Sequence, residues 1–82
     1  MKSNNKSTIA ENIKKYRNKM SVSQDRLSKL ADVTYNTIIK IESGANKNPT
    51  IETLAKIARA LNVGVDDLIK WYGKVKRYSK NW

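Results

Sequence analysis

The stretch SQDRLSKLADVTYNTIIKIESG, residues 23–44, decides the fold because it encodes two short helices joined by a very short turn. Apolar residues recur at helical spacing on both sides of Asp32, and Asp is one of the few residues that tolerate the positive φ of a tight turn. Ser23 can cap the first of these helices and Thr34 the second, and Gly44 suits the left-handed position that ends the second. We therefore predict a helix before Asp32 and a second helix over residues 35–43.

The turn is short enough to force the two helices into a steep crossing with a small shared core. The apolar residues that fit this core are Leu27, Ala31, Val33, Ile38 and Ile41. The buried stripe expected on the first of the two helices is Leu27, Leu30 and Ala31. Ser28 is small, as the close approach of the two helices requires. Such packing leaves one side of the second helix free, with Tyr35, Asn36, Thr37 and Lys40 on it. A helix held out on a rigid partner, with hydrogen-bonding side chains near its N-terminus, suits the major groove of DNA.

Three further helices are expected outside this stretch. Thr8 and Glu11 have capping-box spacing, and the face that follows is Ile9, Ile13, Tyr16 and Met20. Thr50 is the expected cap of a helix whose inner face is Ile51, Leu54, Ile57, Ala58 and Leu61, with Asn62 at its left-handed end. Gly64 starts a short last helix that carries Leu68 and Ile69. Since residues 8–69 show no strand pattern, we predict an all-α domain of five helices.

Charge is the strongest global signal. The 82 residues contain 17 Lys and Arg against 7 Asp and Glu, a net charge of +10, which favours an anionic polymer or surface as the partner. Several short helices do not form the long basic amphipathic helix of a membrane-surface protein. Cys and His are absent, which excludes disulfides, thiolate metal sites and the commonest acid–base residue. No signal peptide or spanning segment is evident, so we expect a cytoplasmic protein. We also expect neither a cofactor nor a metal.

The two ends of the chain differ in composition from the middle. We expect residues 1–7 to be disordered, residues 8–71 to form the domain, and residues 72–82 to form a basic aromatic tail. From residue 70 the sequence KWYGKVKRYSKNW holds five basic residues, four aromatics and no acid. We expect the tail to assist DNA binding; a strand paired across a dimer and plain disorder are the alternatives.

Residues 9–69 resemble the Cro/cI-type, or XRE, helix-turn-helix family of bacterial and phage regulators. The segments that carry the resemblance are SQDRLSKLADVTYNTIIKIESG, NPTIETLAKIARALNV and DDLI, in register and without a gap. Asp32 stands where the family usually has Gly, and Ser28 where it usually has Ala; both fit the geometry. The resemblance implies a lambda-repressor-like fold with the third helix as recognition helix. It also implies a transcriptional regulator, in our interpretation a repressor, that binds a palindromic operator in double-stranded DNA as a homodimer.

The resemblance also implies roles for individual residues. Base contacts are expected from Tyr35, Asn36, Thr37 and Lys40, and phosphate contacts from Gln24, Thr34, Asn46 and Lys47. Arg17 and Glu42 are expected to form a structural ion pair. The dimer interface is expected at Val63, Val65, Leu68, Ile69 and Trp71, an apolar set larger than so small a monomer can easily cover. Side-chain chemistry agrees with the base contacts, since Asn pairs with adenine and Lys donates to guanine.

The sequence leaves alternatives open for one residue and for the function. Ile39 lies by spacing on the exposed side, where it either meets a thymine methyl or sugar or is simply an exposed isoleucine. A protein-binding module on the same fold, such as an antitoxin, is an alternative function in which the tail binds a protein partner. An enzyme has no support, because the seven carboxylates lie at caps, in a turn and in a pair, where they form no converging dyad.

Overall fold

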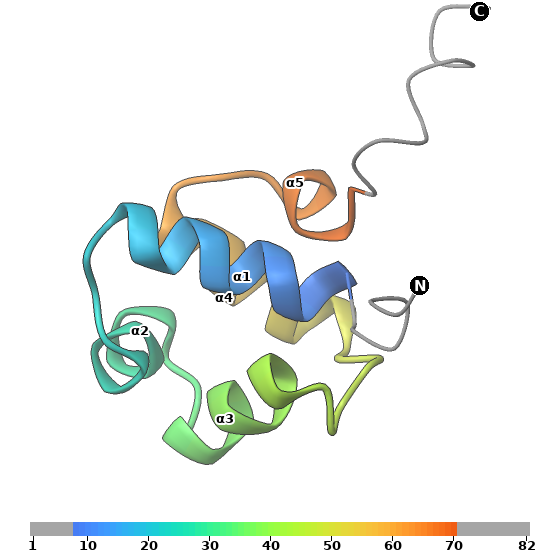
Figure 1. The fold of residues 1–82 in the computed structure, drawn as a ribbon, viewed down its shortest axis with the longest axis horizontal. Helices are drawn as coiled ribbons and strands as arrows, with labels where there is room; N and C mark the ends of the chain where they lie inside the picture. Colours follow the sequence, from blue (N-terminus) through green and yellow to red (C-terminus); the bar gives the residue numbers. More distant parts are fainter. Residues whose placement is uncertain (1–7, 71–82) are drawn as a thin grey trace, which may run out of the picture.

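The computed structural model describes residues 8–70. In this range the chain forms five α-helices: α1 (Thr8–Lys19), α2 (Gln24–Ala31), α3 (Tyr35–Ser43), α4 (Ile51–Leu61) and α5 (Val65–Ile69) (Figure 1). The predicted all-α architecture of five helices is confirmed. The predictions made for residues 1–7, for Trp71 and for the tail with its protein partner lie outside the described residues.

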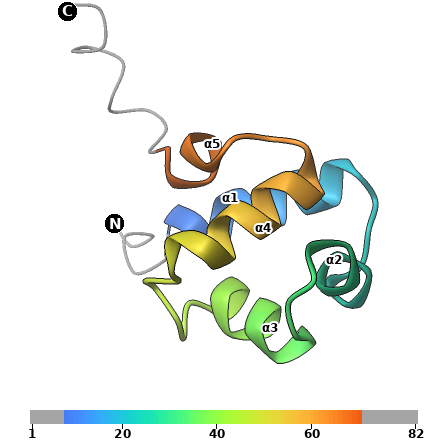
Figure 2. The same ribbon diagram turned by 180° about the vertical axis from the view of Figure 1, so that it is seen from behind.

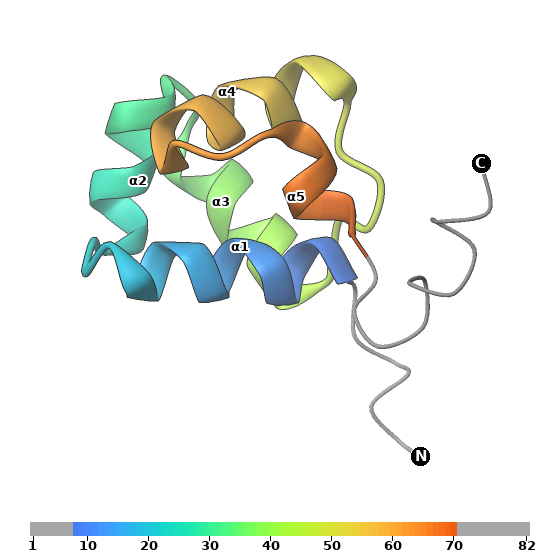
Figure 3. The same cartoon turned by 90° about the horizontal axis from the view of Figure 1, so that it is seen from above.

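The helices form a small bundle around one core. α1 lies between α3 and α5 and contacts both, while α4 packs on α2 and α5 (Figures 1 and 2). Seen from above, α1 and α4 run along opposite sides and α2 closes one end (Figure 3). α3 packs on α2 and α1 and lies at the edge of the molecule (Figure 1). This arrangement supports α3 from one side only.

The ends of the helices follow the predicted local signals. Ser23, Thr34 and Thr50 each accept a hydrogen bond from the backbone N–H three residues later. Left-handed residues end the helices at Asp32 (φ 60°), Gly44 (φ 88°) and Asn62 (φ 62°). Because Asp32 reverses the chain within a single residue, α3 begins only three residues after it. α1 is helical from Thr8, the first residue that the structure describes.

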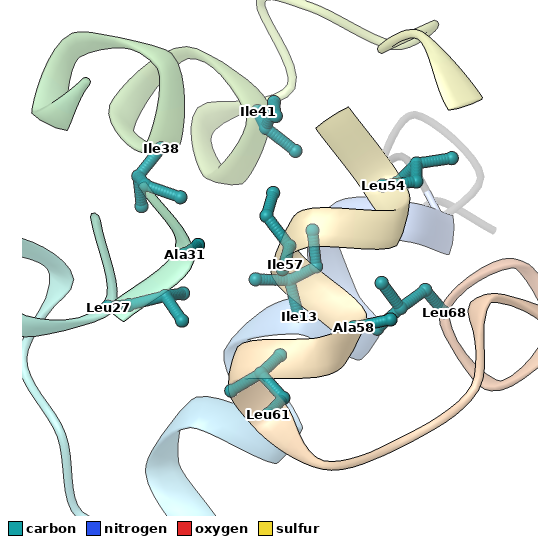
Figure 4. Packing of buried hydrophobic residues seen from close by; sticks show 10 residues of the cluster. All are labelled: Ile13, Leu27, Ala31, Ile38, Ile41, Leu54, Ile57, Ala58, Leu61 and Leu68. Atoms are coloured by element: carbon teal, nitrogen blue, oxygen red, sulfur yellow. The ribbon is translucent and has the colours of Figure 1, made fainter. Parts of the chain in front are cut away.

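All five helices contribute to the hydrophobic core (Figure 4). Its buried members are Ile13, Leu27, Ala31, Ile38, Ile41, Leu54, Ile57, Ala58, Leu61 and Leu68. Full burial of one Ile or Leu side chain contributes roughly 1.5–3 kcal/mol. The core therefore holds α3 in place through Ile38 and Ile41, on the side away from its free face.

Three residues predicted to point inward are exposed. They are Met20, Leu30 and Ile51. Met20 lies beyond the last residue of α1, where Ser21 takes a positive φ and turns the chain away. Ile51 is the first residue of α4 and is 72% exposed. Leu30 is excluded because α2 packs through Leu27, Ser28 and Ala31 instead.

The predicted dimer interface included Leu68, and the structure contradicts this one residue. Its side chain is fully buried and belongs to the core, so it is not available to a second subunit. The physical reason is that α5 has only five residues and attaches to α1 and α4, with Leu68 as its one buried residue. The neighbouring Ile69 is exposed.

Asn12 is a buried polar residue that the sequence analysis did not identify. The residue is 3% exposed, and its Nδ2 donates to the backbone oxygens of Leu68 at 2.7 Å and Lys70 at 2.9 Å. These bonds satisfy carbonyls at the end of α5, which lack partners within so short a helix. The available signal was an Asn one residue before Ile13, within the inner face of α1. Among residues 8–70, no helix combines the length and apolar character needed to cross a bilayer.

Candidate nucleic-acid interface

The outward face of α3 brings together the residues predicted to contact bases. Tyr35, Asn36 and Lys40 are exposed, and Thr37 is half-buried. The opposite face of α3 is buried through Ile38, Ile41 and Glu42. The core and a buried ion pair therefore hold one side of α3, which leaves a phenol, an amide and an ammonium group on the other.

The N-terminus of α3 is stiffened by two threonines. Thr34 Oγ1 accepts a hydrogen bond from the Thr37 backbone N–H at 3.1 Å and lies 2.8 Å from Thr37 Oγ1. A side-chain cap of this kind typically stabilises a helix by about 1 kcal/mol. The first turn, which carries Tyr35 and Asn36, is thus fixed before any partner binds.

Glu42 joins three helices at the base of this face. It is 4% exposed, and its carboxylate accepts hydrogen bonds from Arg17 Nε at 2.8 Å and Arg17 Nη2 at 3.1 Å. Arg17 Nη1 also donates to the Val22 backbone oxygen at 3.0 Å. The predicted Arg17–Glu42 ion pair is thus present, in bidentate form, and links α1 to α3.

Gln24 takes part in the same cluster, which the sequence analysis did not foresee. Its Nε2 donates to Glu42 Oε1 at 2.9 Å, and the residue is half-buried at the start of α2. One of its amide hydrogens is therefore committed within the protein. Its second amide hydrogen remains for the predicted phosphate contact.

The loop after α3 places two more predicted residues beside that helix. The backbone N–H of Asn46 donates to the Lys40 carbonyl at 2.9 Å, which attaches the loop to the end of α3. Asn46 Oδ1 accepts from the Asn48 backbone N–H at 3.1 Å, so this side chain shapes the loop itself. Lys47 is exposed. Within residues 8–70, neither Lys40 nor Lys47 forms an ion pair, so both charges remain available to an anion.

The positive charge is unevenly distributed along the chain. Residues 8–70 carry eleven Lys and Arg and all seven Asp and Glu, a net charge of +4. The six other basic residues lie in residues 1–7 and 71–82, which contain no acid. No group of acidic, His or Cys side chains suited to a metal ion occurs in the part of the chain that the structure describes.

Comparison with known proteins agrees with this geometry. A family model described as helix-turn-helix matches residues 13–68. The control protein C.SmaI of Serratia marcescens is 34% identical over 68 residues, which cover 83% of this chain and 80% of that protein. The N-terminal DNA binding domain of SinR from Bacillus subtilis superimposes with a TM-score of 0.76 at 30% identity, covering 80% of this chain and 96% of that one.

A solved complex with DNA is similar as well. The P22 c2 repressor bound to a synthetic operator superimposes with a TM-score of 0.69 at 29% identity, covering 76% of this chain and 92% of that one. Three findings agree: the family model matches most of the chain, the relatives are similar over most of their length, and the fold has five helices. The chain belongs to the helix-turn-helix (XRE) family of DNA-binding transcription regulators.

Proposed function

We propose that this protein is a sequence-specific repressor that acts in the cytoplasm and binds a palindromic operator in double-stranded DNA as a homodimer. The observation that carries the proposal is the free face of α3, where Tyr35, Asn36 and Lys40 are exposed on a helix supported from one side only. In this arrangement α3 enters the major groove, whose width admits a helix. Asn36 pairs with adenine and Lys40 donates to guanine, while Lys47 and Gln24 bind backbone phosphates.

The direct test is selection of bound sequences from a pool of random duplex DNA at about 100 mM salt, a condition that has to be fixed because affinity depends on it. We expect one enriched sequence with twofold symmetry and half-sites about one helical turn apart, roughly 34 Å. Binding without any enriched sequence would contradict sequence-specific recognition. An enriched site without symmetry would contradict the homodimer.

Substitutions on α3 and in the following loop should separate specificity from affinity. We expect Lys40→Ala and Asn36→Ala to weaken binding to the selected site by about 1–3 kcal/mol and to relax base preference at one position each. Lys47→Ala should weaken binding to all sequences alike, because a phosphate contact carries no base information. Competition binding with selected and random duplexes measures both effects.

A matched control for the loss of charge is Arg59→Ala, an exposed position on α4. It should change neither preference nor affinity by more than the general effect of one charge. If Lys40→Ala lowered binding to selected and random DNA equally, Lys40 would be a phosphate ligand.

The proposed dimer forms through the surface around α5. Ile69 is 51% exposed, while Val63 and Val65 are half-buried and pack against the core from outside. We expect Ile69→Lys to weaken dimerisation at least about tenfold, because a buried interface residue replaced by a charge costs more than ~1.4 kcal/mol. Sedimentation equilibrium measures the change.

Ile51→Lys is a close control for this variant. Ile51 is 72% exposed and lies on α4, so the same substitution there adds the same charge at an exposed isoleucine. We expect this variant to remain dimeric. A wild-type protein that stays monomeric at high concentration, or equal effects of both substitutions, would argue against this interface.

A further inference from the structure

The free face of α3 offers an unusual set of chemical groups for a DNA-reading helix. Along its length the exposed and half-exposed residues include one cation, Lys40, one amide, Asn36, and two largely apolar surfaces, Tyr35 and Ile39. No arginine occurs in α3. Its single acid, Glu42, is buried and holds Arg17 and Gln24.

Ile39 carries apolar surface outside the core of the described residues. The residue is half-buried, yet it is not among the half-buried hydrophobic residues that pack against the core cluster. The inward face of α3 is formed by Ile38, Ile41 and Glu42. Ile39 follows Tyr35 by four positions and Asn36 by three, so it lies one helical turn after them on the same side.

The bases differ in which of these groups they can engage in the major groove. Thymine presents a methyl group, which Ile39 and the ring of Tyr35 can cover, and adenine presents the donor and acceptor pair that matches Asn36. Guanine requires donors, of which Lys40 is the one charged example on this face. The amino group of cytosine donates a hydrogen bond, for which a carboxylate is the best acceptor. The one carboxylate of α3, that of Glu42, already accepts hydrogen bonds from Arg17 and Gln24.

We infer that the operator half-site is rich in A·T pairs and that Ile39 determines specificity by covering a thymine methyl group next to the adenine that Asn36 reads. The inference rests on the proposed function and adds to it the base class that the site prefers. It assigns to Ile39 a role separate from the four residues predicted to contact bases. Apolar contact supplies this part of recognition, and Lys40 supplies the remaining guanine contact.

The experiment replaces each thymine of the selected site in turn by uracil, which removes only the methyl group. We expect the wild-type protein to lose affinity about fourfold at the thymine that Ile39 covers, the value for one buried methyl-sized group. Ile39→Ser should show no loss at that thymine and keep the wild-type response at the others. Ile51→Ser, which changes an exposed isoleucine off α3, should keep the whole wild-type pattern.

Circular dichroism and urea unfolding check that the variants are folded. If Ile39→Ser unfolds, Ile39→Val replaces it, and we expect this variant to lose part of the response to uracil at the thymine that Ile39 covers. A selected half-site rich in G·C pairs would overturn the inference while leaving sequence-specific binding in place. So would an unchanged wild-type affinity for every uracil duplex, or a loss that is equal in wild type and Ile39→Ser at each position. Absence of duplex binding under all conditions would instead overturn the proposed function.

Discussion

Replacing Glu42 with Gln should lower the free energy of unfolding by roughly 3–5 kcal/mol, because removal of one partner strands the other charge in a buried place. Glu42 is 4% exposed, and its carboxylate accepts hydrogen bonds from Arg17 Nε, Arg17 Nη2 and Gln24 Nε2. An amide in its position keeps one acceptor oxygen and loses the charge. The lost interactions are those that join α1, α2 and α3. Urea unfolding followed by circular dichroism measures it.

Two further variants make this measurement specific. Glu52→Gln removes an exposed carboxylate from the first turn of α4, and should cost less than about 1 kcal/mol. The double variant Arg17→Met/Glu42→Leu removes both charges together and should be more stable than Glu42→Gln, since no buried charge is then left unpaired. A loss below ~0.5 kcal/mol for Glu42→Gln would mean that water solvates the pair.

Affinity for duplex DNA should fall about a thousandfold when salt rises from about 50 mM to about 200 mM. If the protein neutralises about six phosphates, the logarithm of the binding constant falls against the logarithm of salt with a slope of roughly −5. The reasons to expect so steep a dependence are the net charge of +10 and the side chains of Lys40 and Lys47, which form no ion pair within residues 8–70. Fluorescence anisotropy over a salt series measures the slope. A flat response, or no binding at ~50 mM salt, would contradict DNA binding by charge neutralisation.

The tail should account for part of this slope. A chain cut after Tyr72 loses four basic residues, Lys74, Lys76, Arg77 and Lys80, and no acid. We expect weaker binding and a shallower slope with little change in melting temperature. A full-length variant with Gln at these four positions separates the effect of charge from the effect of length. A large loss of stability in the cut chain would show that the tail belongs to the fold or to the dimer.

Much of the fold could be predicted because helix ends are encoded locally. The caps at Thr34 and Thr50 and the left-handed Asp32 and Asn62 depend on a residue and its neighbours within a few positions. The errors at Met20, Leu30 and Ile51 concern which residues the packed helices cover, and local sequence does not encode this. An apolar stripe shows which side of α4 faces inward, but whether Ile51 at its tip is covered depends on the length of other elements.

The candidate site shows the same division. The Arg17–Glu42 pair was predicted because the resemblance to the helix-turn-helix family implies it, and the structure contains it. The bond from Gln24 to Glu42 was not predicted, because it depends on which rotamer of a long side chain the packed structure selects. Asn12 was missed for a related reason: its partners are backbone carbonyls 56 and 58 residues away, and no sequence pattern encodes them.

The two hydrogen bonds donated by Asn12 hold the end of the described chain close to its beginning. Thr8 lies one helical turn before Asn12, about 6 Å along the helix axis, and Lys70 accepts one of the bonds directly. A short glycine–serine linker could therefore join residue 70 to residue 8, and the loop between α3 and α4 could supply new termini. In such a circular permutant every core contact is retained while α4 becomes the first helix and α3 the last. The order of the helices along the chain is thus separable from the packing that holds α3 outward.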